Sequence, residues 1–330
     1  MMAKITFIGT GAWASGLANV LSKNNHKIIM WGIDENEIKD INQGLNSKYF
    51  ANLKFNNPHN LTATANLNLA LEDTDLIILA VPSPAIADVI SKIKQILKTR
   101  KVNVINVSKG IDFNSKKFIS ELVKDEFGPN LNNFASLIGP SFATEVFQNH
   151  HTMINIVGLN SLFLDKVARL FNNDTFKLKI NTDEHGSEVF SALKNVLAVG
   201  IGISSYLYPS KNLAPALISQ GLNEIYLIAK KMFPQTQTTT GYQLAAIGDI
   251  VLTCLSTTSR NYSFGLKVGE LGVEKSLKLN DKTVEGFNTA LILNNMKAEL
   301  QNLDIPLLNS IIDILLNNKD KEKLLDFYWK

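Results

Sequence analysis

Short apolar runs alternate with segments of helical spacing through the first half of the 330-residue chain. The apolar runs predict six strands, which are KITFIGTG (4–11), KIIMWGID (27–34), TDLIILAVPS (74–83), VNVINVSKG (102–110), NFASLIGPSFA (133–143) and HTMINIVGL (151–159). Helices are expected in AWASGLANVLSKN (12–24) and DENEIKDINQG (34–44). Near-continuous apolar strands separated by helices are typical of a parallel sheet that is buried on both faces. The pattern therefore predicts an α/β domain with a doubly wound sheet.

After about Thr182 the apolar positions recur at helical spacing, and no convincing strand pattern is present. Helices are expected in EVFSALKNVLAVGIGISSYLY (188–208), NLAPALISQGLNEIYLIAKKMF (212–233), TGYQLAAIGDIVLTCLS (240–256) and LLNSIIDILLNN (307–318). The third of these follows the polar loop QTQTTTG, so Thr240 or a neighbour is expected to cap it. The chain is thus predicted to form an α/β domain over residues 1–182 and an all-α domain over residues 183–330.

The turn after the first strand carries Gly9, Gly11 and Ala14, which form the pattern G-x-G-x-x-A. In a Rossmann-type domain the first glycine makes a tight turn, the second admits the pyrophosphate, and the third position needs a small residue. Asp34 ends the second strand, where a carboxylate accepts hydrogen bonds from the ribose 2′-OH. No arginine is near it in sequence and the closest preceding lysine is Lys27, so NAD is favoured over NADP. The alternative is that Asp34 only caps the following helix.

Composition narrows the class of protein further. An apolar fraction of 45%, a charged fraction of 19% and a net charge of +3 are ordinary for a globular protein and do not favour nucleic-acid binding. The single cysteine, Cys254, lies in an apolar run and is expected to be buried rather than reactive. No signal peptide, membrane span or metal-ligand spacing of the five histidines is recognisable. A cytoplasmic protein without a metal site is expected.

Five further segments occur in a specific order, namely VSKG (107–110), GPSFATEV (139–146), ALKNVLAVGIG (192–202), IGDIVLTC (247–254) and SRNYSFG (259–265). With VEGF at 284–287, they resemble the NAD(P)-dependent glycerol-3-phosphate dehydrogenase family over nearly the whole chain. The resemblance implies reversible hydride transfer between a nicotinamide cofactor and the pair dihydroxyacetone phosphate and sn-glycerol 3-phosphate. It also implies a dinucleotide-binding first domain, a helical substrate domain, a homodimer and a product that feeds glycerophospholipid synthesis.

The resemblance assigns residues by position. Lys194 matches the general acid/base, with Lys109, Asn195 and Asp249 beside it. The matches to substrate contacts are Lys109, Gly139, Ser141, Lys194, Asp249, Ser259, Arg260 and Asn261. The matches to cofactor contacts, beyond Gly9, Gly11, Ala14 and Asp34, are Ala12, Trp13, Ile33, Lys109, Ala143, Arg260 and Glu285. This chain departs from the family at Ile33 and Asp34, where basic residues are frequent, in the loop Ser204 to Asn212, and at Ser219 to Gly221.

The chemistry of these residue types agrees with the assignment. A lysine in the apolar helix around Lys194 either reaches solvent from the helix edge or has a perturbed pKa. Lys109 nearby would lower that pKa, which suits proton donation to a developing alkoxide, and Asp249 would oppose the shift. Arg260 is either a surface arginine or a bidentate phosphate ligand. Trp13 either covers the pyrophosphate or packs on the sheet.

Two other functions remain open from the residues. A β-hydroxyacid dehydrogenase of related architecture would also use a catalytic lysine, but it would recognise a carboxylate instead of a phosphate. A non-catalytic NAD(H)-sensing module would keep the glycine turn and would have no need of Lys109, Lys194 and Asp249 together.

Overall fold

The computed structural model describes residues 3–112, 115–280 and 284–329. The chain folds into two units. Unit 1 comprises Met1–Ser108 and Lys117–Thr182, and unit 2 comprises Lys109–Lys116 and Asp183–Lys330. The short segment Lys109–Lys116 therefore leaves the first unit in the middle of its sequence and folds with the second.

Unit 1 is built on an eight-stranded sheet with the strand order β3-β2-β1-β4-β5-β6-β7-β8. The strands are β1 (Lys4–Ile8), β2 (Lys27–Trp31), β3 (Leu61–Thr64), β4 (Leu76–Leu79), β5 (Val102–Asn106), β6 (Leu131–Ile138), β7 (Thr152–Val157) and β8 (Phe176–Asn181). The six expected strands are present, and the doubly wound α/β fold is confirmed. The first six strands have the order of a Rossmann fold, in which the chain changes direction between β1 and β4.

Two features of the sheet differ from the expectation. The pairing of β6 with β7 is antiparallel, whereas a parallel sheet was expected. The helix between them, α7 (Ala143–Phe147), spans only about 8 Å at 1.5 Å per residue, too short to return the chain along the sheet. The strands β3 and β8 were missed because both are edge strands. In β8 the exposed positions include Lys177 and Lys179, so the segment lacks a continuous apolar run.

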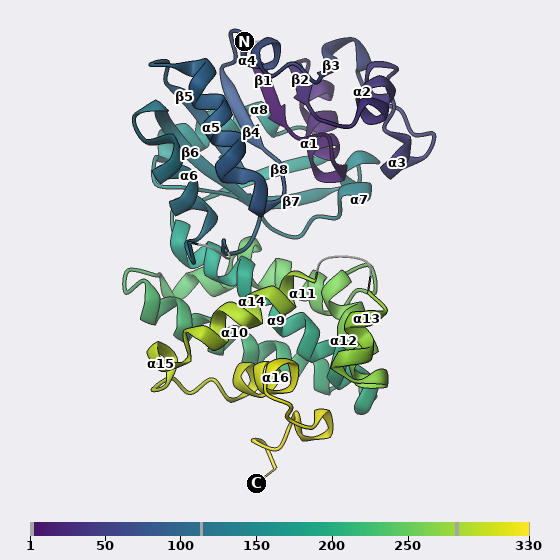
Figure 1. Cartoon of the computed structure of the whole chain (residues 1–330), viewed down its shortest axis with the longest axis vertical. Coiled ribbons are helices and arrows are strands. Elements are labelled where there is room, and N and C mark those ends of the chain that lie inside the picture. The colour runs from purple at the N-terminus through teal and green to yellow at the C-terminus, as the bar shows by residue number, and fades with distance from the viewer. Residues whose placement is uncertain (1–2, 113–114, 281–283, 330) are drawn as a thin grey trace. The chain divides into compact units, whose positions relative to one another are not determined.

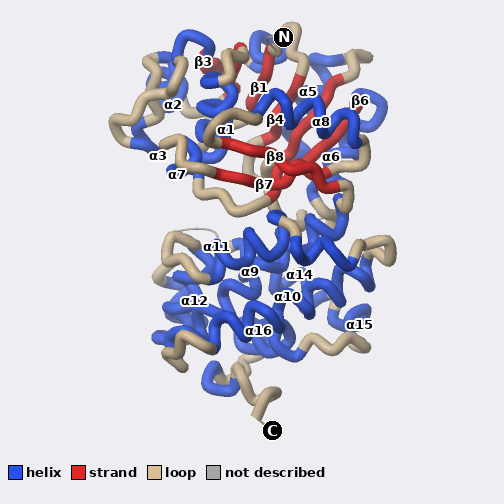
Figure 2. The backbone as a smooth tube through the Cα atoms, turned by 180° about the vertical axis from the view of Figure 1, so that it is seen from behind, coloured by secondary structure: helices blue, strands red, loops and turns tan. Residues whose placement is uncertain are grey.

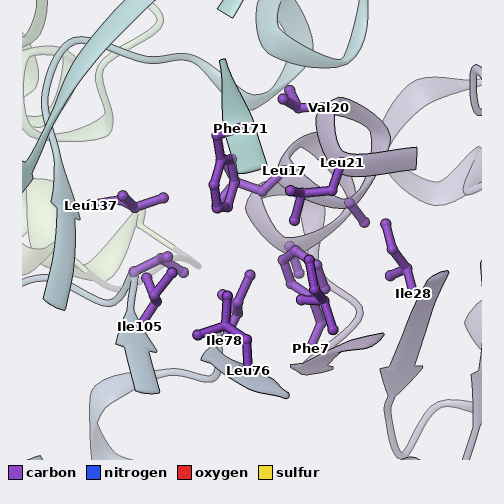
Figure 3. Packing of buried hydrophobic residues seen from close by; sticks show 14 of the residues in the cluster. Phe7, Leu17, Val20, Leu21, Ile28, Leu76, Ile78, Ile105, Leu137 and Phe171 are labelled. Atoms are coloured by element: carbon purple, nitrogen blue, oxygen red, sulfur yellow. The ribbon is translucent and has the colours of Figure 1, made fainter. Parts of the chain in front are cut away.

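Helices cover both faces of the sheet. The helices of unit 1 are α1 (Ala12–Lys23), α2 (Glu35–Asn42), α3 (Ser47–Phe50), α4 (Leu67–Leu71), α5 (Ile86–Leu97), α6 (Ile119–Phe127), α7 and α8 (Ser161–Phe171). On one face, Leu17 of α1 and Phe171 of α8 pack over Phe7 and Ile78 (Figure 3). On the other face, α5 and α6 pack over a second cluster that contains Ile77. Because neighbouring residues of β4 point to opposite apolar layers, the strand reads as a continuous apolar run.

The described residues of unit 2 form helices joined by loops and no strand, as the absence of red strands there in Figure 2 shows. Its helices are α9 (Glu184–Leu207), α10 (Leu213–Met232), α11 (Asp249–Cys254), α12 (Arg260–Leu271), α13 (Val273–Lys278), α14 (Glu285–Asn295), α15 (Lys297–Leu300) and α16 (Pro306–Leu316). The 24-residue α9 contacts α10, α11, α12, α14 and α16, which surround it in Figure 1. Among the described helices α9 alone is long and apolar enough to cross a membrane, but 89% of its apolar window is buried inside the protein. It is the core helix of the unit.

The helix expected over 240–256 is divided into three turns of different pitch. A 3₁₀ turn (Thr238–Tyr242) is followed by a π-helical turn (Leu244–Gly248) and then by α11. No side chain caps the 3₁₀ turn, the π-helical turn or α11, so the expected capping by Thr240 or a neighbour is wrong. The Thr240 hydroxyl instead donates a hydrogen bond to Asp183. Asp183 caps α9 and also accepts from the backbone of Gln237, so it ties the start of α9 to this segment. The π-helical turn places Asp249 at the first residue of α11.

Candidate active site

The glycine turn of unit 1 has the shape that a dinucleotide requires. Gly9 has φ of +125°, and a Cβ atom there would lie 2.6 Å from the carbonyl oxygen of Ala80 beside β4. Only glycine fits this turn. Gly11 is the N-cap of α1, makes no side-chain capping bond, and has no atom within 4 Å of where a Cβ would lie. The first N–H groups of α1 thus face an open approach at the carboxyl end of β1, as phosphate binding needs.

The remaining positions of the motif shape the start of α1. Ala14 is buried, and a Cβ atom on Gly16 would lie 3.3 Å from the carbonyl oxygen of Ala143, so α1 and α7 pack closely. Ala12 and Trp13 are partly buried and pack against the apolar cluster of this face. This packing agrees with one of the two interpretations of Trp13, and its contact with the cofactor stays a prediction.

Asp34 at the end of β2 caps α2. Its Oδ1 atom accepts hydrogen bonds from the backbone N–H groups of Asn36 at 3.0 Å and Glu37 at 3.3 Å. The side chain remains 38% exposed, so capping leaves it accessible to a ligand. The neighbouring Ile33 is 85% exposed. Sequence reasoning considered only lysines that precede Asp34, and it missed Lys48, whose Nζ atom lies 3.2 Å from Oδ2 of Asp34.

Gly139, Ser141 and Ala143 follow β6 in unit 1. A Cβ atom on Gly139 would lie 2.7 Å from the Cβ atom of Ile154, so this position needs glycine for close packing against β7. The Ser141 hydroxyl donates to the carbonyl oxygen of Gly139 at 3.1 Å. Ala143 opens α7. The other predicted substrate contacts, including Ser259, Arg260 and Asn261, belong to unit 2.

Unit 2 brings together three ionisable side chains that the sequence spreads over 140 positions. Oδ1 of Asp249 lies 2.8 Å from Nζ of Lys194, and Oδ2 of Asp249 lies 2.9 Å from Nζ of Lys109. Lys194 and Asp249 are 5% and 2% exposed, whereas the Lys109 side chain is 23% exposed. A single buried carboxylate therefore holds two ammonium groups, of which one is enclosed and one is partly open to solvent.

The buried pair has perturbed pKa values. Burial is the largest influence on the pKa of Lys194 and lowers it; the charge of Asp249 raises it, the charge of Lys109 lowers it, and the net result is a lowered pKa. Burial alone would raise the pKa of Asp249, but Lys109 and Lys194 outweigh burial and hold that pKa below its usual value. At neutral pH the carboxylate stays ionised, and the proton on Lys194 is easier to remove than that of a solvated lysine.

Thr253 belongs to the same cluster, and sequence reasoning missed it. Its hydroxyl oxygen lies 2.8 Å from Nζ of Lys194 and donates to the carbonyl oxygen of Asp249 at 2.6 Å. Because that hydroxyl hydrogen is given to Asp249, the oxygen accepts from Lys194. The available signal was the spacing of four residues from Asp249, which puts both side chains on one face of α11. Thr253 and Asp249 together fix the direction of two of the three Lys194 donor bonds.

A second set of hydrogen bonds links α9, α12 and α14. Nδ2 of Asn195 donates to Glu285 at 3.0 Å, and Nδ2 of Asn261 donates to Oδ1 of Asn195 at 2.9 Å. The guanidinium of Arg260 lies 3.2 Å from the other oxygen of Glu285. Ser259 is the N-cap of α12, and its hydroxyl accepts from the backbone of Tyr262 at 3.3 Å. The predicted phosphate ligands thus lie together at the N-terminus of α12, where the Arg260 side chain is 55% exposed.

The close crossing of α9 and α12 explains how this set is positioned. A Cβ atom on Gly202 would lie 2.3 Å from the carbonyl oxygen of Tyr262, and one on Gly265 would lie 2.1 Å from that of Val199. Two facing glycines let the helix backbones touch, which brings Asn195 and Asn261 within hydrogen-bond distance. The divergent loop Ser204 to Asn212 lies at the far end of α9, which continues to Leu207 before α10 begins at Leu213.

Other candidate chemistry is not supported in the described part of the chain. Cys254 is buried, and burial raises the pKa of its thiol, as a structural cysteine requires. Within residues 3–112, 115–280 and 284–329, no three His, Cys, Asp or Glu side chains come together in a way that suits a metal ion.

Comparison with known proteins covers both units. The sequence profile of the NAD-dependent glycerol-3-phosphate dehydrogenase N-terminus matches residues 4–161, and the profile of the C-terminus matches residues 183–326. A glycerol-3-phosphate dehydrogenase, NAD(P)+, of Malacoplasma penetrans is 42% identical over 333 residues, covering 99% of this chain and 97% of that protein. A protein of the same name from Mesoplasma florum is 36% identical over 98% of this chain and 96% of its own length.

Solved structures agree with the sequence comparison. The crystal structure of glycerol-3-phosphate dehydrogenase from Coxiella burnetii has a TM-score of 0.87 and 28% identity, and the match covers 100% of this chain and 99% of that chain. The glycine turn in a doubly wound sheet, joined to a helical unit, defines the class of NAD(P)-dependent oxidoreductases. Within that class, the chain belongs to the NAD-dependent glycerol-3-phosphate dehydrogenase family.

Proposed function

We propose that this chain catalyses the reversible, NAD(P)-dependent interconversion of dihydroxyacetone phosphate and sn-glycerol 3-phosphate. The observation that carries this proposal is the cluster in which Asp249 bonds both Lys194 and Lys109 inside unit 2. Ketone reduction needs a proton for the carbonyl oxygen as its negative charge grows. A buried lysine with a lowered pKa, held in place by a carboxylate, supplies that proton.

Most of the proposed cofactor contacts lie in unit 1, whereas Lys109, Arg260 and Glu285 belong to unit 2. Gly9 and Gly11 leave the space that a pyrophosphate needs, and the N-terminus of α1 offers it N–H donors. Asp34 accepts from the adenosine ribose, and the remaining proposed contacts are Ala12, Trp13, Ala14, Ile33, Lys109, Ala143, Arg260 and Glu285. The bound nicotinamide supplies the hydride. A carboxylate at Asp34 favours NAD over NADP, since it would repel a 2′-phosphate.

Each residue of the buried cluster has a distinct proposed part in the proton transfer. Lys194 donates a proton from Nζ to the substrate oxygen and takes it back in the reverse direction. Asp249 and Thr253 orient Nζ, so that its remaining N–H is the one available to substrate. Lys109 lowers the pKa of Lys194 by charge repulsion and adds positive charge for the developing alkoxide.

The phosphate of the substrate is proposed to bind at the start of α12. Arg260 offers a planar, permanently charged fork, and Ser259 and Asn261 add neutral polar groups on the same turn. Gly139 and Ser141 of unit 1 are the remaining proposed contacts. Asn195 supports the phosphate ligands through its hydrogen bond with Asn261.

The division of labour follows the two predicted domains. Residues 1–182 are proposed to hold most of the dinucleotide, and residues 183–330, together with Lys109, Gly139 and Ser141, are proposed to bind substrate and carry out proton transfer. We further propose a cytoplasmic homodimer whose sn-glycerol 3-phosphate feeds glycerophospholipid synthesis.

The test is the loss of NADH absorbance with dihydroxyacetone phosphate at neutral pH, beside the same assay with NADPH. Turnover is expected, and Lys194→Ala is expected to lower it by about a thousandfold while NADH still binds. Turnover of a 3-oxo acid instead would favour a β-hydroxyacid dehydrogenase. Binding of NADH without turnover of any ketone would favour an NAD(H)-sensing module. Full turnover by Lys194→Ala would overturn the mechanism.

A further inference from the structure

A cavity of about 350 Å³ lies beside the carboxyl end of β2 in unit 1. Its lining residues carry charges of both signs and are Asp34, Asn36, Glu37, Lys39, Asp40, Gln43, Ser47 and Lys48. In a doubly wound fold this edge receives the adenosine ribose of a bound dinucleotide. The charges around the cavity therefore bear on the preference between a dinucleotide with a 2′-hydroxyl and one with a 2′-phosphate.

Lys48 is held between two carboxylates of this cavity. Its Nζ atom lies 3.2 Å from Oδ2 of Asp34 and 2.5 Å from Oε1 of Glu37. The Lys48 side chain is 54% exposed, whereas Glu37 is 6% exposed. The ammonium has three N–H groups, two of which these contacts occupy, so one donor remains for solvent or for a ligand.

Glu37 connects Lys48 to the glycine turn. Its Oε2 atom accepts from the hydroxyl of Thr10, which stands between Gly9 and Gly11, at 2.5 Å. Its Oε1 atom also accepts from the hydroxyl of Tyr49 at 3.1 Å. A buried carboxylate with these three donors is a fixed anchor, and it holds the Lys48 ammonium beside Asp34 in a defined place.

The charge of the trio formed by Asp34, Glu37 and Lys48 favours a hydroxyl. Two carboxylates and one ammonium leave the trio with one net negative charge, which opposes a doubly charged 2′-phosphate. A 2′-OH instead donates to an oxygen of Asp34. Removing the charge of Asp34 would leave Lys48 opposite Glu37 alone, with a second N–H group free and no net charge at the site.

On the basis of the proposed use of a nicotinamide dinucleotide, we propose that Lys48 is a latent ligand for a 2′-phosphate, restrained by Asp34 and Glu37. The trio, and not Asp34 alone, then sets the preference for NAD over NADP. Lys48 is a specificity-determining residue that takes no part in hydride or proton transfer. Its effect depends on which carboxylates share its ammonium.

The test measures dissociation constants for NADH and NADPH from the fluorescence of the reduced nicotinamide, without substrate. Wild type is expected to bind NADH more tightly. Asp34→Asn keeps a capping side chain, and it is expected to tighten NADPH binding by about tenfold, as one charge-assisted hydrogen bond does. Adding Lys48→Gln is expected to remove the whole gain. Competition by 2′,5′-ADP against 5′-AMP should follow the same order.

Two controls separate the role of Lys48 from general effects. Lys39→Gln removes another lysine that lines the cavity, and in the Asp34→Asn background it should leave the NADPH gain intact. Lys48→Arg in that background should keep the gain, because the cation is retained. Urea unfolding of each variant verifies that it is folded before binding is measured.

The outcomes are distinct. A NADPH gain that survives Lys48→Gln would overturn the inference and assign the preference to the charge of Asp34 alone. No gain in Asp34→Asn would also overturn it, and would leave Asp34 as a helix cap. Failure of wild type to bind either dinucleotide would overturn the proposed function together with the inference.

Discussion

Two charge clusters in this protein have opposite stoichiometry, and their central groups differ in burial, since Asp249 is enclosed and Lys48 is half-exposed. In unit 2 one carboxylate, Asp249, bonds two lysines inside the helical core. In unit 1 one lysine, Lys48, bonds two carboxylates beside an open cavity. Burial lowers the pKa of Lys194, whereas hydrogen bonds from Lys48 to Glu37 and Asp34 raise the pKa of Lys48.

The comparison of Lys194 with Lys48 indicates which surroundings allow a lysine to donate a proton. Both lysines have a carboxylate within 3.2 Å, so an ion pair by itself does not decide the role. Lys194 is desolvated and lies near a second lysine, Lys109; both effects lower its pKa, so its proton is easier to remove than that of a solvated lysine. Lys48 is half-exposed and contacts two carboxylates, so it keeps its proton and acts as a fixed charge.

The largest expected effect is on turnover. Lys194→Ala removes the proton donor, and kcat for ketone reduction should fall by about a thousandfold, within the range for general acid–base groups. The dissociation constant of NADH should stay near the wild-type value, because the variant leaves unit 1 unchanged. Stopped-flow absorbance gives the first quantity and nicotinamide fluorescence the second. Lys39→Gln, which replaces an exposed lysine outside the buried cluster, is the matched control. A similar loss of kcat in this variant would show that the effect is not specific to the buried lysine.

The next effect is on stability. Asp249→Asn leaves two ammonium groups without their carboxylate, and loss of one partner of a buried pair costs about 3 kcal/mol of unfolding free energy. Urea unfolding at neutral pH measures it. The same change at the accessible Asp34 should leave the unfolding midpoint nearly unchanged, since asparagine also caps a helix. Equal losses at both positions would show that burial does not separate the two clusters.

The pH dependence of Asp249→Asn has a definite sign. Asp249 raises the pKa of Lys194, so its removal lowers that pKa further. Between this lowered folded-state pKa and the higher pKa of lysine in the unfolded chain, the unfolded state binds more protons, so the stability of the variant rises with pH. Ketone reduction needs protonated Lys194, so kcat/KM should begin to fall at lower pH in the variant than in wild type. A fall that begins at the same pH would remove Lys194 as the acid.

A smaller effect is expected at the phosphate site. Arg260→Gln removes the charged fork at the start of α12, and KM for dihydroxyacetone phosphate should rise about thirtyfold, which corresponds to about 2 kcal/mol for a charge-assisted bond. Because Arg260 also bonds Glu285, Glu285→Gln serves as the comparison variant. An unchanged KM in Arg260→Gln would remove this residue from the substrate site.

Local and long-range features differed in how well the sequence predicted them. The glycine turn could be predicted because Gly9, Gly11 and Ala14 follow an apolar strand and open a helix. The antiparallel β7 could not, because the direction of a strand depends on where its connection runs and not on its own apolar pattern. Lys48 was missed because α3 returns it to Asp34 from 14 positions later in the chain.

The buried cluster of Lys109, Lys194 and Asp249 also depends on contacts between residues that are far apart in the sequence. Nothing in the neighbourhood of Lys109 indicates that its partner is Asp249, and only the resemblance to a family placed the two together. The structure adds the distances, the burial and the direction of each pKa shift. The π-helical turn before α11 also escaped prediction, although it places Asp249, because a Leu-Ala-Ala run is compatible with an ordinary helix.

The smallest expected effect concerns Thr253, which orients Lys194 without supplying charge. Thr253→Val keeps the shape and removes the hydroxyl that Lys194 and Asp249 share, so kcat should fall about fivefold, as for loss of one neutral hydrogen bond of about 1 kcal/mol. KM for the substrate should stay constant, whereas the pH profile should move slightly, because Lys194 loses an acceptor that stabilises its charged form. Thr253→Ser, which keeps the hydroxyl, should restore kcat. A Thr253→Val variant with wild-type kcat would show that Asp249 alone orients Lys194. The direction of the N–H group that Lys194 presents to substrate would then depend on one carboxylate.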